Sequence, residues 1–134
     1  MDKTELVRAA SEARKNAHVP YSNFAVGAAI LTKAGHIFKG CNVENISFRL
    51  TLCAEEAALG AAVANGQTDL VAVAVVADSQ HPIVPCGGCR QLMAEFNPDL
   101  KVISATLGGN TETYSLSELL PRPKQGILER PNES

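Results

Sequence analysis

Three cysteines and one glutamate have the types and spacing of a metal-centred catalytic site. Cys53 and Glu55 stand two residues apart, and Cys86 and Cys89 follow later, separated by two glycines. Structural zinc sites fill all four coordination positions with Cys or His, whereas catalytic sites keep one position for water. Zinc lowers the pKa of its bound water toward roughly 7, and a carboxylate that is not a ligand can then carry protons. Three sulfurs and a free carboxylate therefore favour hydrolysis, with Glu55 as the proton carrier.

Two other interpretations of the cysteines stay open. The remaining cysteine, Cys41, could complete a four-sulfur structural site, although a lone buried cysteine is also common as a small apolar residue. The pair Cys86 and Cys89 could instead be a redox dithiol, because CxxC alone is a weak motif. The upstream Cys53-Ala54-Glu55 segment favours catalytic zinc over both alternatives.

The predicted elements place the cysteines at the starts of helices. Helices are expected to begin at Cys53 and near Cys86, where free backbone N–H groups favour the thiolate form. Cys89 follows Cys86 by one helical turn and could complete the clamp. Gly87 and Gly88 would let the backbone approach the metal without a side-chain clash.

The hydrophobic pattern predicts an α/β fold. Apolar residues at three- and four-residue spacing from Leu6 to Ala17 indicate an amphipathic helix that ends before Pro20. Further helices are expected over 53–64, 87–96 and 116–120, and strands over 24–31, 37–43, 70–77, 102–105 and 111–114. This order predicts a three-layer α/β/α sandwich with one mixed, roughly five-stranded sheet.

Composition narrows the domain count and the class of partner. A chain of 134 residues that is 46% hydrophobic can form one ordinary core. We expect a catalytic domain over 1–120 and a polar, proline-containing tail over 121–134 that does not order itself alone. The net charge of −2 and the absence of a Lys/Arg run argue against nucleic acid as a partner and favour a small molecule. No apolar segment predicts a signal peptide or a membrane span, so we expect a cytoplasmic protein.

Several motifs resemble those of the small, homotetrameric, zinc-dependent cytidine deaminases. Zinc nucleobase deaminases carry HxE followed by PCxxC, with an all-cysteine ligand set as a variant. The segments 20–24 (PYSNF) and 42–45 (NVEN) are also similar to that family, and the resemblance extends to about residue 120. It implies one Zn²⁺ per subunit and a homotetramer. It also implies hydrolysis of cytidine and deoxycytidine to uridine and deoxyuridine with release of ammonia, in pyrimidine salvage.

The same resemblance implies a nucleoside pocket. Asn42 and Glu44 would bind the ribose hydroxyls, and Phe24 would pack against the pyrimidine. The backbone N–H of Ala54 and the carbonyl of Pro85 would contact the base. From the residues themselves, Asn42 and Glu44 lie two apart on an expected strand and so share a face, although a solvated strand end is the alternative. For Phe24 the alternative is a place in the core.

The chain departs from the family next to the proton carrier. Family members usually have Arg after this glutamate, whereas this chain has Glu56. Three thiolates and one zinc already carry an excess negative charge, so another anion nearby is unfavourable unless a cation compensates. We predict that Arg90 or Arg49 does so. The alternative is that Glu56 turns away on the helix.

Two further departures concern substrate choice. Phe48 stands where the family commonly has Tyr, and 121–124 replaces a stretch that ends in an aromatic residue. We therefore expect wider access and tolerance of N4-substituted cytidines. Deamination of another aminopyrimidine nucleoside, such as a blasticidin-like antibiotic, and a noncatalytic zinc-binding module remain alternative functions.

Overall fold

A single mixed sheet forms the middle layer of the protein. The computed structural model describes residues 2–123. Five strands occur in the spatial order β2-β1-β3-β4-β5: β1 (Val26–Thr32), β2 (Ile37–Cys41), β3 (Leu70–Ala77), β4 (Lys101–Thr106) and β5 (Thr111–Ser115). Strands β3 and β4 are parallel, and the other neighbouring pairs are antiparallel. The predicted mixed, five-stranded sheet is confirmed.

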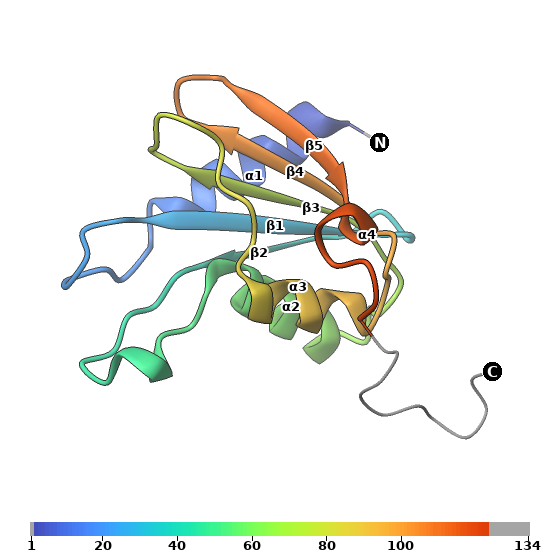
Figure 1. Ribbon diagram of the computed structural model, residues 1–134, viewed down its shortest axis with the longest axis horizontal. Coiled ribbons are helices and arrows are strands. Elements are labelled where there is room, and N and C mark those ends of the chain that lie inside the picture. Colours follow the sequence, from blue (N-terminus) through green and yellow to red (C-terminus); the bar gives the residue numbers. More distant parts are fainter. Residues whose placement is uncertain (1, 124–134) are drawn as a thin grey trace.

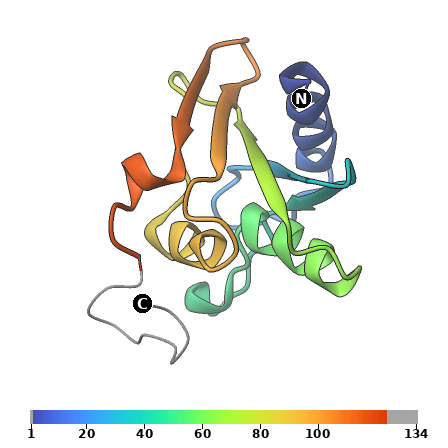
Figure 2. The ribbon, with the colours of Figure 1, turned by 90° about the vertical axis from the view of Figure 1, so that its right-hand side faces the viewer.

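Helices cover both faces of this sheet (Figure 1). Helix α1 (Lys3–Arg14) packs on one face, whereas α2 (Ala54–Ala64) and α3 (Gly87–Ala94) lie together on the other (Figure 2). The short helices are η1 (Phe48–Leu50) and α4 (Leu116–Leu119). The three-layer sandwich is therefore confirmed. In the part of the chain that the structure describes, every helix is too short or too polar to cross a bilayer.

Several elements are shorter than the sequence predicts. The first strand begins at Val26, two residues after the expected start, where its pairing with Ala77 of β3 begins. The second strand ends at Cys41, two residues before the expected end. The first and third helices end at Arg14 and Ala94. Of the predicted tail, 124–134 lie outside the described residues, and the domain boundary at 120 stays a prediction.

Two glycines allow the helices to approach the sheet closely. A Cβ at Gly40 of β2 would lie 2.4 Å from the carbonyl oxygen of Ala54 and 2.4 Å from the backbone nitrogen of Ala58. A Cβ at Gly27 of β1 would lie 1.9 Å from the carbonyl oxygen of Ala10 in α1. Each glycine thus leaves space that helix backbone occupies. Gly40 matters for the site, because it lies under the first turn of α2.

Candidate metal centre and active site

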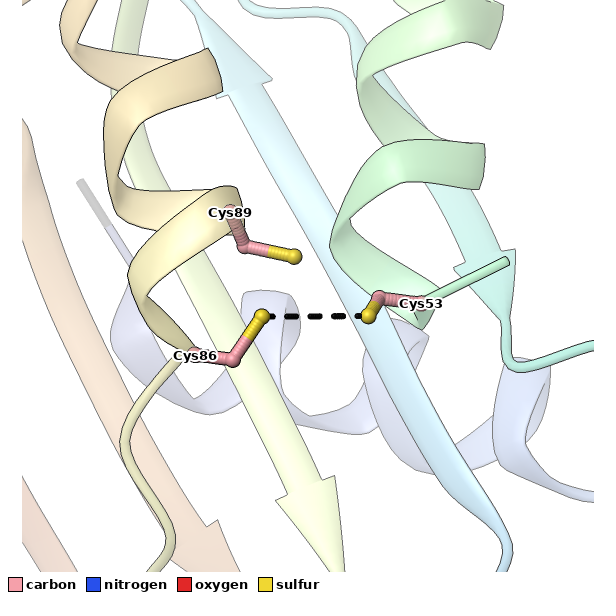
Figure 3. Close-up of side chains that lie close together, drawn as sticks. All are labelled: Cys53, Cys86 and Cys89. Carbon is pink, nitrogen blue, oxygen red and sulfur yellow. Dashed lines mark hydrogen bonds between the residues drawn. The ribbon is translucent and has the colours of Figure 1, made fainter. Parts of the chain in front are cut away.

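Three cysteine sulfurs converge at one point between α2 and α3 (Figure 3). The Sγ atoms of Cys53, Cys86 and Cys89 all lie within 4.8 Å of one another, and those of Cys53 and Cys86 are 3.9 Å apart. A tetrahedral zinc ion with Zn–S bonds of about 2.3 Å places its sulfurs roughly 3.8 Å apart. The spacing and the chemistry of the donors therefore fit zinc.

The cysteines stand at helix starts, as predicted. Cys53 is the N-cap of α2 and Cys86 is the N-cap of α3, while Cys89 lies in the first turn of α3. Figure 3 shows the two helix starts directed at the same place. Free N–H groups at both starts contribute positive potential there, which favours thiolates over thiols.

Burial of the cysteines opposes that effect. It raises the pKa of Cys53 to about 12 and also raises the pKa of Cys89. For Cys86, burial alone would raise the pKa, but hydrogen bonds from the backbone and side chain of Cys89 outweigh it and lower the pKa. Ligand thiols must lose their protons to bind zinc. The positive charge of a bound cation would stabilise the thiolates that burial disfavours.

Cys41 lies apart from the three sulfurs. Because Gly40 faces α2, the neighbouring Cys41 points to the opposite face of the sheet, where it lines a pocket with Glu12 and Asn16 of the α1 region. Among the described residues, the group that could hold a metal contains Cys53, Cys86 and Cys89 without Cys41. The alternative in which Cys41 completes a four-sulfur structural site is wrong.

We therefore expect Cys41→Ser to leave one zinc per chain. The substitution changes a side chain on the opposite face of the sheet from the cluster. Metal analysis of the purified variant, with Cys89→Ser as the matched control that does lose zinc, would test this. A zinc content in Cys41→Ser as low as that of Cys89→Ser would contradict it.

Glu55 is buried next to the metal cluster. Glu55 is 6% exposed, and it lines a cavity of about 200 Å³ together with Cys53 and Cys86. Burial raises the pKa of Glu55, and the charge of Glu56 raises it further. A carboxyl group whose pKa moves toward neutrality can both accept and donate a proton, which is what a proton carrier requires. The position of Glu55 agrees with the predicted role.

Asn42 lines this cavity, and its side chain bonds to the backbone at the start of β1. Its Oδ1 accepts a hydrogen bond from the N–H of Val26 (2.9 Å), and its Nδ2 donates to the carbonyl of Phe24 (2.9 Å). Because β2 ends at Cys41, Asn42 does not lie on a regular strand, so the structural premise of its prediction is wrong. The amide nevertheless lines the predicted pocket.

Glu44 lies in a neighbouring pocket of about 330 Å³. Its carboxylate accepts hydrogen bonds from the N–H groups of Tyr21 (3.0 Å) and Ser22 (3.1 Å) and from the hydroxyl of Ser22. The hydroxyl of Ser22 is the main cause of the lowered pKa of Glu44, so this group stays ionised. Thr51 lines both pockets, which are therefore adjacent.

The other predicted binding residues differ in their surroundings. Ala54 is buried and lines the first cavity. Pro85 is fully buried, and its carbonyl accepts a hydrogen bond from Nε of Arg90 at 2.7 Å. Phe24 is 39% exposed, so the alternative of a core position is wrong, and it lies beyond the residues that line the two pockets.

Glu56 folds back onto the start of its own helix. Its Oε1 accepts a hydrogen bond from the backbone N–H of Cys53 at 3.1 Å, so the alternative in which it turns away is wrong. Arg90 donates to two backbone carbonyls, and Arg49 lies on the exposed η1. Within residues 2–123 the hydrogen bonds join neither arginine to a sulfur. Compensation of the cluster by Arg90 or Arg49 stays a prediction.

Several residues that line the two pockets were not predicted from the sequence. Thr51, Leu52, Ile83 and Val84 line the first cavity, and Tyr21 lines the second. Thr51, Leu52, Ile83 and Val84 each lie within three positions before a cysteine ligand, and Tyr21 lies in the 20–24 segment. Their proximity to the motifs was the available signal, but it does not indicate which side chains face inward.

Comparisons with known proteins agree with this geometry. The model of the family described as "Cytidine and deoxycytidylate deaminase zinc-binding region" matches residues 1–105. A cytidine deaminase from Halalkalibacterium halodurans is 51% identical over 122 residues, which cover 90% of this chain and 92% of the relative. A blasticidin-S deaminase from Bacillus cereus is 37% identical over 107 residues, covering 72% and 74%. The crystal structure of cytidine deaminase from Burkholderia pseudomallei superposes with a TM-score of 0.88 at 46% identity, covering 91% of this chain and 98% of that chain.

Proposed function

This chain belongs to the cytidine and deoxycytidylate deaminase family, and we propose that it hydrolyses cytidine and deoxycytidine to uridine and deoxyuridine with release of ammonia. The reaction serves pyrimidine salvage. The observation that carries the proposal is the buried Glu55 carboxyl in the same cavity as two of three convergent cysteine sulfurs. This arrangement joins a zinc site to a proton carrier that is not a ligand.

The residues of the chain divide the work as follows. Cys53, Cys86 and Cys89 would hold one zinc ion per subunit, which would supply the Lewis acidity that makes water nucleophilic near neutral pH. Glu55 takes a proton from the attacking water and delivers it to N3 of the cytosine ring. It then takes the remaining proton from the oxygen now bonded to C4 and delivers it to the amino nitrogen, so that the C4–N bond breaks, ammonia leaves and the C4 carbonyl of uridine forms. Glu55 itself is only 6% exposed, which limits the contact of its carboxyl group with bulk water.

The second pocket supports a free nucleoside rather than a nucleotide. Among the residues that the structure describes, those lining it include the ionised Glu44 and no lysine or arginine, so a substrate phosphate would face repulsion there. We propose that Glu44 and Asn42 bind ribose hydroxyls, that Phe24 contacts the pyrimidine, and that the N–H of Ala54 and the carbonyl of Pro85 contact the base. Support for Glu44 comes from its charged carboxylate, which Tyr21 and Ser22 hold beside the cavity that Cys53 and Cys86 line.

A direct assay tests the activity. We expect purified protein to change the ultraviolet absorbance of cytidine to that of uridine and to release ammonia, and a chelator to abolish both. Deoxycytidylate, which carries the phosphate, serves as the matched control and should react far more slowly. Metal-loaded protein that releases no ammonia from cytidine or deoxycytidine would contradict the proposal and leave a noncatalytic zinc-binding module.

Substrate breadth is a separate prediction. Phe48 is 72% exposed and packs edge-on against Tyr21, with ring centroids 5.8 Å apart, at the edge of the second pocket. From the departures at Phe48 and at 121–124, we expect the chain to tolerate N4-alkyl or N4-acyl cytidines. Parallel kcat/KM measurements on cytidine, deoxycytidine, an N4-substituted cytidine and blasticidin S would show the range. A complete lack of turnover of the N4-substituted analogue would contradict tolerance, and faster turnover of blasticidin S would favour the antibiotic as the main substrate.

We also propose a homotetramer located in the cytoplasm. Support for assembly comes from exposed apolar side chains in the loop before Cys53 and on the outer sides of α2 and α3. Their exposed fractions are 81% for Ile46, 57% for Leu50, 42% for Val63 and 43% for Leu92. The centres of subunit interfaces are depleted of charged residues, and these four side chains carry no charge.

A further inference from the structure

Arg90 connects two segments that are distant in sequence. It lies on α3, directly after the metal ligand Cys89, and its side chain is half-buried. Nε donates to the carbonyl of Pro85 at 2.7 Å, and Nη1 donates to the carbonyl of Leu119 at 3.1 Å. One guanidinium thus holds the segment that enters the metal site and the end of the last helix described.

The first of these bonds fixes a peptide plane at the metal. The carbonyl of Pro85 belongs to the peptide group that also contains the backbone nitrogen of Cys86, so its orientation sets the entry into that ligand. The N–H of Arg90 also donates to the carbonyl of Cys86 at 2.9 Å. Arg90 therefore bonds to Pro85 through its side chain and to Cys86 through its backbone N–H.

The hydrogen bond from Arg90 to Leu119 gives a partner to a backbone carbonyl at the C-terminal end of α4. Leu119 is the last residue of α4, where backbone carbonyls lack partners within the helix. A cation at a helix C-terminus is favourable, and the planar guanidinium can serve two acceptors at once in a fixed geometry. The end of the described fold is thereby tied to the peptide that precedes a metal ligand.

We propose that Arg90 is a positioning residue of the metal centre. By holding the carbonyls of Pro85 and Leu119 together, it locks the Pro85–Cys86 peptide against α4 and keeps the Cys86 sulfur in place for the metal. Its consequence for turnover rests on the proposed function, because Pro85 then presents its carbonyl to the base. Its consequence for metal retention does not.

The matched variants are Arg90→Met, Arg90→Lys and Gln91→Ala. Methionine keeps a long apolar stem but donates nothing, whereas lysine keeps the charge and loses the two-pronged geometry. Gln91 is the control, because its Nε2 ties the same helix to the carbonyl of Pro123 (3.0 Å) without contacting Pro85. The measurements are the rate of zinc transfer to a chelating dye, kcat and KM for cytidine, and the melting temperature.

We expect Arg90→Met to release zinc about tenfold faster, with a comparable loss of kcat/KM, since a hydrogen bond from a charged donor is lost. Arg90→Lys should restore part of both losses. Gln91→Ala should stay within about twofold of wild type, as exposed substitutions usually do. If Arg90→Met does not fold, Arg90→Lys carries the test. A zinc-release rate in Arg90→Lys that exceeds the wild-type rate by less than about twofold would then count against the proposal.

Two results would overturn the inference. One is a lowered melting temperature in Arg90→Met with wild-type zinc release and kcat/KM, which would assign Arg90 a merely structural role. The other is equally fast zinc release in Gln91→Ala, which would point to general anchoring of the chain end. If wild-type protein has no activity on cytidine, the proposed function fails, but the zinc-release comparison still tests Arg90.

Discussion

Replacing Glu55 with glutamine will lower kcat for cytidine by about 10²–10⁴-fold while zinc stays bound. Glutamine has nearly the same shape, but its amide cannot carry protons from water to the ring and on to the departing ammonia. Zinc should remain, because its expected ligands are the sulfurs of Cys53, Cys86 and Cys89, and Glu55 is not among them. Steady-state kinetics and metal analysis on the same preparation provide the measurement.

The matched control is Glu112→Gln, the same chemical change on the edge strand β5, where Glu112 is exposed and bonded to Tyr114. This control should keep both activity and zinc. Wild-type kcat in Glu55→Gln would exclude Glu55 as the proton carrier. Loss of zinc from that variant would instead show that Glu55 is a ligand.

Replacing Gly40 with alanine should destabilise the protein by about 3 kcal/mol and weaken zinc binding. The new methyl group would lie 2.4 Å from backbone atoms of Ala54 and Ala58, which cannot rotate away as a side chain could. Helix α2 must therefore shift from the sheet, and its first turn carries Cys53 and Glu55. Denaturant unfolding and competition for zinc with a chelator measure the two effects.

Gly27→Ala is the control for Gly40→Ala. Its methyl group meets the backbone of α1 at 1.9 Å, so we expect a comparable loss of unfolding free energy on the other face of the sheet. Zinc affinity should change much less, because α1 carries none of the three sulfurs. Unchanged zinc affinity in Gly40→Ala, despite destabilisation, would show that the position of α2 does not govern the metal site.

Local patterns in the sequence were sufficient for the elements and the chemical groups. The apolar run of β3 was predicted with its observed bounds, Leu70–Ala77, because a strand buried on both faces has a distinctive composition. The ligand spacing indicated Cys53, Cys86 and Cys89, since one helical turn separates the last two. Both kinds of signal depend on neighbours along the chain, which the sequence displays directly.

Strand ends and side-chain partners were not predictable in the same way. Asn42 and Glu44 were expected on one strand face, but Asn42 bonds to backbone at the start of β1, and Glu44 bonds to the turn at Tyr21 and Ser22. These partners lie 16 or more positions away along the chain. No periodicity within a short window can report such contacts.

The sequence by itself determined which groups are available: four thiols, the carboxyl of Glu55, and the helices and strands that carry them. Only the tertiary structure decided which groups meet. It brought Cys53 on α2 beside Cys86 on α3, and it sent Cys41 to the opposite face of the sheet. The physical reason is that a helix can approach a sheet only where the strand leaves space for its backbone. Gly40 provides that space under α2, and the alternation of side chains along β2 then directs Cys41 away.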